Sequence, residues 1–238
     1  MNKDTLQHLL FLDIETVAET DEYDNLSERK RKLWEKKSSF FREADENTAE
    51  EMYERAGIYA EFGKIVVISI GFFSVIEPEL KLRIKSIYGH DEKQLLQEFA
   101  DLLNKHFDQK TLKLCAHNGK EFDFPYIARR MLINQIELPW TLQLAGKKPW
   151  EIPHIDTLEL WKFGDYKHFT SLDLLAEIFD IETSKDDIDG SQVNGIYYKE
   201  KDLERIMRYC MKDVAVLVQV FLSLNQFQKV KPENITMV

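Results

Sequence analysis

The sequence LLFLDIET (residues 9–16) places two carboxylates in an otherwise apolar run. The run is short and apolar on both faces, which is typical of a central strand of a buried sheet. Because successive side chains of a strand point to opposite faces, Asp13 and Glu15 project from the same side. A buried carboxylate costs free energy unless a salt bridge, a helix cap or a metal ion compensates it. We therefore expect a central strand whose two acids meet one of these partners.

The composition is that of a globular protein, with 238 residues of which 44% are hydrophobic and 12% aromatic. This length allows one large α/β domain, or two small domains. No stretch approaches the roughly eighteen consecutive apolar residues of a membrane span, and residues 1–10 do not resemble a signal peptide. We expect a soluble cytoplasmic protein with no membrane partner, in which Cys115 and Cys210 are packed thiols.

The formal net charge of −10 at pH 7 bears on nucleic-acid binding. A protein that grips nucleic acid over a wide surface neutralises many phosphates with Lys and Arg, so this balance argues against that mode. A narrow site at which metal ions supply the positive charge remains compatible with an acidic chain.

Strands alternate with helices along most of the chain, which predicts a layered α/β fold. Apolar runs and alternating patterns predict further strands at residues 64–73, 82–88, 111–116 and about 152–156. Helical spacing of apolar residues predicts helices at residues 91–107, 124–134 and 201–224. Two more helices open with capping signals, namely Asp156 with Glu159 and Thr170 with Asp173.

Residues 20–62 differ from the rest, because they are dense in Glu, Lys and Arg and separate two strands that could otherwise pair. Helices are expected within them at residues 27–37 and 47–60. We interpret this segment as a charged helical insertion in a single domain that spans residues 1–238.

Two further motifs follow the first strand at long intervals. In HNGKEFD (residues 117–123), Asn118 and Asp123 flank a turn after the fourth predicted strand. In YCMKD (residues 209–213), Tyr209 and Asp213 are four residues apart and share a helix face. Each motif alone also fits a structural role: a solvated strand end for DIE, a common turn or helix cap for the second, and the edge of an amphipathic helix for the third.

Taken together and in this order, the three motifs resemble those of the DEDD exonuclease superfamily in its tyrosine subclass. The histidine subclass has His five residues before the last Asp, where this chain has Arg208. The stretches EFGKIVVISIGFF, SLDLLAEIFDI and DGSQVNGIYY resemble a bacterial group of predicted 3′-to-5′ exonucleases, similar to the proofreading domain of family-B DNA polymerases.

The resemblance implies a ribonuclease-H-like fold, with a mixed five-stranded sheet of order 3-2-1-4-5 flanked by helices. It implies two Mg²⁺ or Mn²⁺ ions, with Asp13 bridging them, Glu15 and Asp213 completing the ligands of one ion, and Asp123 holding the other. Oxygen ligands suit these hard ions. The remaining roles implied are contact of Glu15 with the 3′-hydroxyl, orientation of the attacking water by Tyr209, and shaping of the site by Asn118.

The implied activity is hydrolysis of single-stranded DNA from a free 3′ end. An exoribonuclease is the alternative within the same chemistry, because ribonuclease D and its relatives share the tyrosine subclass. A nuclease-like module that binds nucleic acid without cutting it would have lost carboxylates, whereas all four are present here. A protein-interaction scaffold is suggested only by the charged insertion.

Two segments could hold the substrate, and each has a structural alternative. Residues 28–37 are locally basic, with Trp34, Phe40 and Phe41 available to stack on bases, or to pack in a core. Residues 139–150 place two lysines between Trp140 and Trp150 and form the second candidate.

Overall fold

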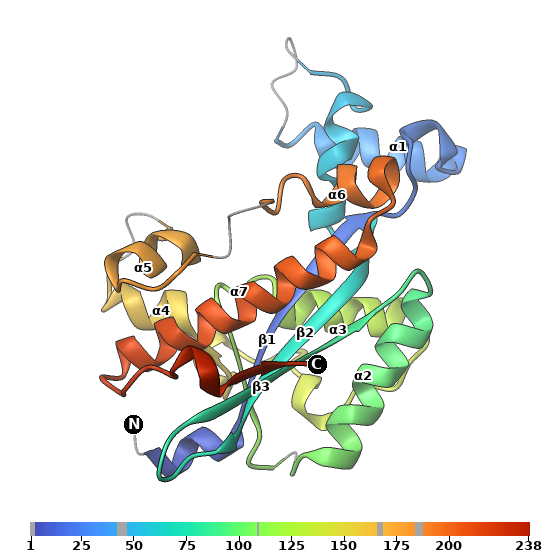
Figure 1. Ribbon diagram of the computed structural model, residues 1–238. Helices are drawn as coiled ribbons and strands as arrows, with labels where there is room; N and C mark the ends of the chain where they lie inside the picture. The colour runs from blue at the N-terminus through green and yellow to red at the C-terminus, as the bar shows by residue number, and fades with distance from the viewer. Residues whose placement is uncertain (1–2, 42–46, 109, 166–168, 184–187) are drawn as a thin grey trace.

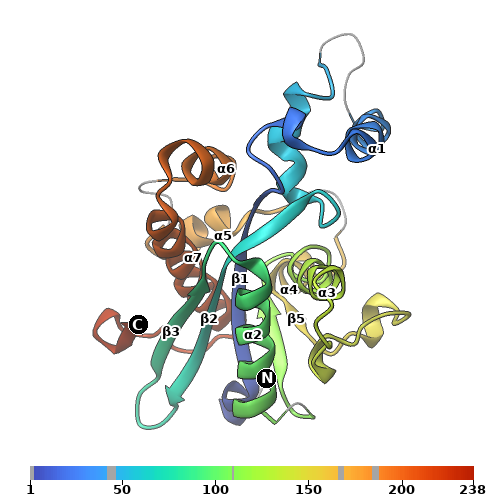
Figure 2. The same cartoon turned by 90° about the vertical axis from the view of Figure 1, so that its right-hand side faces the viewer.

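A mixed sheet forms the centre of the protein, whose computed structural model describes residues 3–41, 47–108, 110–165, 169–183 and 188–238 (Figures 1 and 2). Within these residues the sheet has six strands in the order β5-β4-β1-β2-β3-β6. The strands are β1 (Leu9–Ala18), β2 (Gly63–Val75), β3 (Lys81–Tyr88), β4 (Lys113–Ala116), β5 (Ile155–Asp156) and β6 (Ile235–Met237). The predicted ribonuclease-H-like order of the first five strands is confirmed. The predicted total of five was wrong, because β6 adds a parallel strand beside β3.

Helices cover both faces of the sheet. On one face lie α2 (Glu92–His106) and α3 (Asp123–Ile133), and on the other lies the long helix α7 (Leu203–Leu224) (Figure 2). The shorter elements are α4 (Thr157–Lys162), α5 (Leu172–Ile178), α6 (Val193–Gly195), the π-helix η6 (Ile196–Glu200), and the 3₁₀ helices η1 (Lys3–His8), η4 (Trp140–Leu142), η5 (Pro149–Glu151) and η7 (Pro232–Asn234). Among the described helices, none is long and apolar enough to cross a membrane.

Strand β1 is buried on both faces, as its apolar run predicts. Leu10, Leu12 and Ile14 belong to the core cluster beneath α2 and α3. Leu9 and Phe11 belong to the cluster beneath α7. By alternation, the side chains of residues 13 and 15 therefore lie on the α7 side of the strand.

Helix α7 approaches the sheet closely at Gly71 of β2. A Cβ atom at this position would lie 2.8 Å from Cγ1 of Val214 on α7. The glycine thus lets the final helix pack directly over the central strands, which brings its polar residues next to β1.

The segment between β1 and β2 has a small core of its own and projects at the top of Figure 1. It contains η2 (Tyr23–Asn25), α1 (Glu28–Ser38) and the 3₁₀ helix η3 (Glu51–Ile58). Trp34 is fully buried in this core, and its indole N–H donates to the Ala49 carbonyl oxygen at 2.7 Å. The predicted α-helix at residues 47–60 is instead a 3₁₀ helix over residues 51–58, and residues 42–46 lie outside the described residues.

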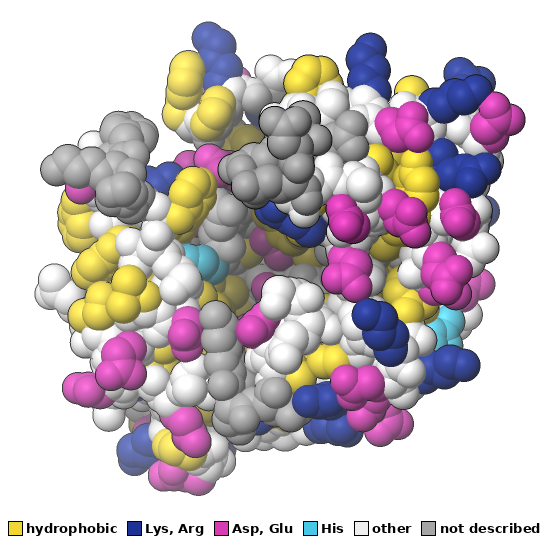
Figure 3. All heavy atoms as spheres, turned by 90° about the horizontal axis from the view of Figure 1, so that it is seen from above, with side chains coloured by type: hydrophobic (Ala, Val, Ile, Leu, Met, Phe, Trp, Pro, Cys, Tyr) yellow, Lys and Arg dark blue, Asp and Glu magenta, His cyan; other side chains and the backbone are white. Residues whose placement is uncertain are grey.

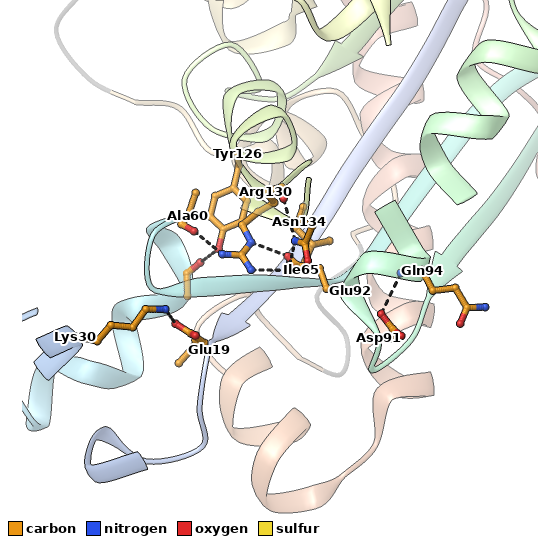
Figure 4. Close-up of polar contacts among 12 residues, drawn as sticks. Glu19, Lys30, Ala60, Ile65, Asp91, Glu92, Gln94, Tyr126, Arg130 and Asn134 are labelled. Carbon is orange, nitrogen blue, oxygen red and sulfur yellow. Dashed lines mark hydrogen bonds and ion pairs between the residues drawn. The ribbon is translucent and has the colours of Figure 1, made fainter. Parts of the chain in front are cut away.

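A buried ion pair fastens α3 and α2 to the start of β2 (Figure 4). The Arg130 guanidinium donates to the Glu92 carboxylate, with Nε 2.8 Å from Oε1, and to the Ala60 carbonyl oxygen at 2.8 Å. Glu92 Oε1 also accepts the backbone N–H of Ile65 at 2.7 Å. The hydroxyl of Tyr126 donates to the Gly57 carbonyl oxygen at 2.6 Å. The helix that begins at Asp123 is therefore tied to the end of the insertion.

Candidate active site

Asp13 and Glu15 lie on β1, next to an irregularity in the pairing of β1 with β2. Glu15 pairs with Val67 and Thr16 pairs with Ile65, so one residue of β2 is left over between them. Such bulges bend a strand and change the direction of nearby side chains. Asp13 is half-buried and Glu15 is only 7% exposed.

Helix α7 contributes the next two residues from the opposite side. The helix begins after Asp202, whose side chain accepts the N–H of Arg205 at 2.9 Å. Tyr209 is buried, whereas Asp213 is half-buried. The Cys210 thiol donates to Oδ2 of Asp13 at 3.3 Å, which places the start of the YCMKD motif directly against β1.

The turn after β4 contributes the remaining two residues. Because β4 runs parallel to β1, both strands end at the same edge of the sheet. Asn118 is half-buried in the turn, with a left-handed φ of 61° that asparagine tolerates better than most residues. Asp123 is the first residue of α3 and is 3% exposed.

The carboxylates are near enough to one another to shift each other's protonation. Burial raises the pKa of Asp13 well above its ordinary value, and the charges of Asp213 and Asp123 add to the rise. Burial also raises the pKa of Glu15, with added repulsion from Asp13, Asp213 and Asp123. Acids separated by two hundred positions in the sequence thus lie within electrostatic range of one another.

The pKa values of Asp123 and Tyr209 are also raised. Burial raises the pKa of Asp123 to about 7, and the charge of Asp156 adds to this. Burial raises the pKa of the Tyr209 phenol well above its usual range, followed by repulsion from Asp213 and Glu15. In the metal-free chain Tyr209 therefore keeps its proton at neutral pH, and its hydroxyl is available as a hydrogen-bond donor.

The residues present fit divalent metal ions. Glu15 is 93% buried, yet within the described chain no residue forms a hydrogen bond or an ion pair with its carboxylate. Ligand atoms of Asp13, Glu15 and Cys210 all lie within 4.8 Å of one another. Neighbouring acids add to the raised pKa of Asp13 and of Glu15, so a cation is called for if both are to be ionised, and oxygen donors suit Mg²⁺ or Mn²⁺.

Figure 3 looks down on the molecule from above Figure 1 and shows a hollow in this face. Acidic side chains line the interior of the hollow, and hydrophobic side chains gather along one flank.

The two segments considered for substrate binding, residues 28–41 and 139–150, differ in whether their aromatic side chains are exposed. The proposed stacking role of Trp34 is wrong, because that residue is buried in the core of the insertion, although Phe40 is 79% exposed. Trp140 and Trp150 are both exposed, and the Lys148 ammonium lies over the Trp150 ring. Their loop packs against the start of β4 through His154, which donates to the Thr141 carbonyl oxygen and accepts the N–H of Leu114.

Two residues beside the cluster were not predicted as part of the site. Cys210 was interpreted only as a packed thiol, and Asp156 only as a helix cap. A weaker signal exists for Asp156, because it ends a predicted strand that pairs with β4.

The fold is of the ribonuclease-H-like class, and acidic residues of β1, α3 and α7 gather beside its central strand. Residues 58–234 match the family described as "predicted 3'-5' exonuclease related to the exonuclease domain of PolB", and the chain belongs to this family. The predicted resemblance to the proofreading domain of family-B polymerases is thereby confirmed.

A solved structure supports the same fold. The family-B DNA polymerase from the hyperthermophilic archaeon Pyrobaculum calidifontis superposes with a TM-score of 0.54 at 14% sequence identity. The match covers 90% of this chain and 24% of the polymerase, so the chain spans about a quarter of that protein's length. A search of curated proteins returns no match.

Proposed function

We propose that the protein is a metal-dependent 3′-to-5′ exonuclease that releases nucleotides from the 3′ end of single-stranded DNA. The observation that carries this proposal is the convergence of four buried or half-buried carboxylates from β1, α3 and α7, in which the charges of Asp123 and Asp213 add to the raised pKa of Asp13 and of Glu15. Membership of a family of 3′-to-5′ exonucleases supports the reaction class.

We assign the metal ligands to Asp13, Glu15, Asp123 and Asp213. Two hard divalent ions held by these residues would supply a nucleophile at neutral pH and charge stabilisation at the attacking and leaving oxygens. In this assignment Asp13 serves both ions, Glu15 and Asp213 serve one, and Asp123 serves the other.

The remaining residues position the substrate and water. Tyr209 keeps its proton, so its hydroxyl donates a hydrogen bond that orients the attacking water and does not act as a base. Glu15 accepts a hydrogen bond from the terminal 3′-hydroxyl. Asn118 occupies the turn beside Asp123 and shapes the site near the scissile phosphate.

The choice of DNA over RNA is supported by the relation of the family to the exonuclease domain of a DNA polymerase. A matched pair of DNA and RNA oligonucleotides, labelled at the 5′ end, tests it directly. With Mn²⁺ we expect a ladder of products shortened from the 3′ end for single-stranded DNA, and slower shortening of RNA.

The control for this assay is a DNA oligonucleotide blocked at its 3′ end, which should persist. Activity confined to RNA would overturn the substrate assignment. Binding of the oligonucleotide with no release of nucleotides, in either Mg²⁺ or Mn²⁺, would overturn the enzyme itself in favour of a binding module.

A further inference from the structure

Asp156 is a buried carboxylate that the proposed reaction does not use. It is the last residue of β5 and the N-cap of α4, and it is 3% exposed. Its partner across the sheet is Ala116, the last residue of β4, in parallel register. The residue therefore stands next to the point where the turn of residues 117–120 leaves the sheet.

Three backbone N–H groups converge on this carboxylate. Oδ1 accepts from Leu158 at 2.9 Å, which is the bond of an ordinary helix N-cap. Oδ1 also accepts from Asn118 at 2.9 Å, and Oδ2 accepts from Lys120 at 3.1 Å. Capping α4 requires only the first bond, so the other two hold the turn.

The turn needs such support because its backbone is constrained. Asn118 has the left-handed φ of 61°. At the next residue, Gly119, a Cβ atom would lie 2.4 Å from Cβ of Ala116 and 2.9 Å from Cζ of Phe124. The chain is therefore packed tightly at a point where one residue is already in an uncommon conformation.

The turn leads directly into α3 and so into Asp123. Phe122 donates its N–H to the Asn118 carbonyl oxygen at 3.0 Å, and Phe124 donates to the Gly119 carbonyl oxygen at 2.9 Å. These bonds flank Asp123 in the chain. A displacement of the turn would thus be passed to the carboxylate of Asp123 as well as to the side chain of Asn118.

Other contacts between the turn and the first residues of α4 also hold the turn in place. Nδ1 of His117 lies 2.9 Å from Oγ1 of Thr157, and Nζ of Lys120 forms an ion pair with Glu159 at 2.7 Å. Asp156 contacts the turn only through backbone N–H groups in the described chain. It therefore fixes the path of the backbone and does not depend on the identity of the side chains in the turn.

We propose that Asp156 is a positioning residue, which clamps the turn of residues 117–120 and thereby sets the positions of Asn118 and Asp123. This inference rests on the proposed exonuclease function for its consequences, but the clamp itself is a property of the fold. Hydrogen-bonded partners behind metal ligands typically change metal affinity or activity by about 10- to 100-fold when they are replaced.

The test uses Asp156→Asn and Asp156→Ser in the full chain. Asparagine presents an NH₂ group to one of the backbone donors, whereas serine keeps one oxygen for the helix cap and cannot reach both turn amides. Asp91→Asn is the matched control, because Asp91 caps α2 through the N–H of Gln94 and does not touch the turn.

Three readouts distinguish positioning from general loss of structure. Amide hydrogen exchange by NMR should accelerate at Asn118 and Lys120 in both Asp156 variants and not in the control. Mn²⁺ affinity, measured by electron paramagnetic resonance, should fall about 10- to 100-fold. The kcat for a single-stranded oligonucleotide should fall by a similar factor, with KM changed much less.

The failure of this inference is separable from the failure of the proposed function. If the wild type cleaves DNA and the Asp156 variants show unchanged amide exchange, Mn²⁺ affinity and kcat, the positioning role is wrong and the exonuclease stands. Reduced thermal stability with unchanged Mn²⁺ affinity would likewise reduce Asp156 to a helix cap. If the wild type neither binds Mn²⁺ nor cleaves, the function fails first, and the role of Asp156 in it fails as well.

Discussion

Two groups of buried carboxylates in this protein have opposite surroundings. Glu92 and Asp156 receive their hydrogen bonds from groups of the fold, namely Arg130 and backbone N–H groups. Glu15 has no such partner among the described residues, and burial, with added repulsion from other acids, raises its pKa and that of Asp13. The fold compensates the buried charges of the first group, whereas those of the second cost stability until a cation arrives.

The largest expected effect comes from removing a carboxylate of the second group. Asp13→Asn should abolish cleavage, by more than about 10⁴-fold or about 5 kcal/mol of activation free energy, because this residue is assigned to both ions. Release of labelled nucleotides from a single-stranded oligonucleotide measures the effect.

The fold should survive this change, since the substitution removes a repelling charge. Thermal unfolding without metal should therefore show Asp13→Asn at least as stable as the wild type. Residual activity of Asp13→Asn within tenfold of the wild type would contradict the assignment. Asp213→Ala should also abolish cleavage.

Removing the cation of the first group should affect stability instead of chemistry. Arg130→Met leaves the Glu92 carboxylate buried without its charged partner, which is expected to cost about 3–5 kcal/mol of unfolding free energy. Urea unfolding measures this. Adding Glu92→Gln to the same variant should recover part of the loss, and an additive further loss would contradict the pairing.

The protonation of Asp123 gives a pH dependence whose sign follows from its raised pKa. The group holds its proton up to about pH 7 in the folded chain, against an ordinary value of 3.8, so stability without metal is lost as pH rises between these values. The expected loss is on the order of a few kcal/mol, and Asp123→Asn should abolish it.

The difference between the wild type and Asp123→Asn measures the contribution of Asp123 together with its repulsion of Asp13 and Glu15. Burial lowers the pKa of His154 to about 4, so that residue contributes in the opposite direction over the same window, and its contribution cancels in the difference. Saturating Mn²⁺ should stabilise the wild type more at pH 8 than at pH 5. A difference that does not change between pH 4 and pH 7 would contradict the prediction.

The smallest effect is expected at the phenol. Tyr209→Phe removes one hydrogen bond to the attacking water, so kcat should fall by about tenfold, near 1.4 kcal/mol, while Mn²⁺ affinity stays unchanged. Steady-state kinetics and Mn²⁺ titration measure the two quantities. A loss as complete as that of Asp13→Asn would mean that the hydroxyl does more than orient water.

Much of the secondary structure follows from the sequence, and its failures have local reasons. The apolar run at residues 9–14 predicted the core of β1 because both faces of that strand are buried. The predicted cap at Thr170 was wrong by one residue, because the adjacent Ser171 accepts the N–H of Leu174. Strand β6 was missed because three residues carry no periodic pattern and are extended only through pairing with β3.

The site residues stay predictions, but their proximity depends on elements far apart in the chain. The motif letters indicated that Asp13, Asp123 and Asp213 belong together. Asp156 was interpreted as a cap from its spacing, and the two bonds to the turn of residues 117–120 could not be foreseen, because they join segments almost forty residues apart.

The sequence by itself determined which chemistry is available, since oxygen ligands, an aromatic hydroxyl and their order along the chain are fixed by residue identity. It also determined the strands and helices that carry these groups, because hydrophobic periodicity acts locally. Only the tertiary structure decided which carboxylates are compensated by the fold and which are left to repel one another. That outcome depends on desolvation and on distances between segments that meet only when β1, β4 and α7 pack around one core.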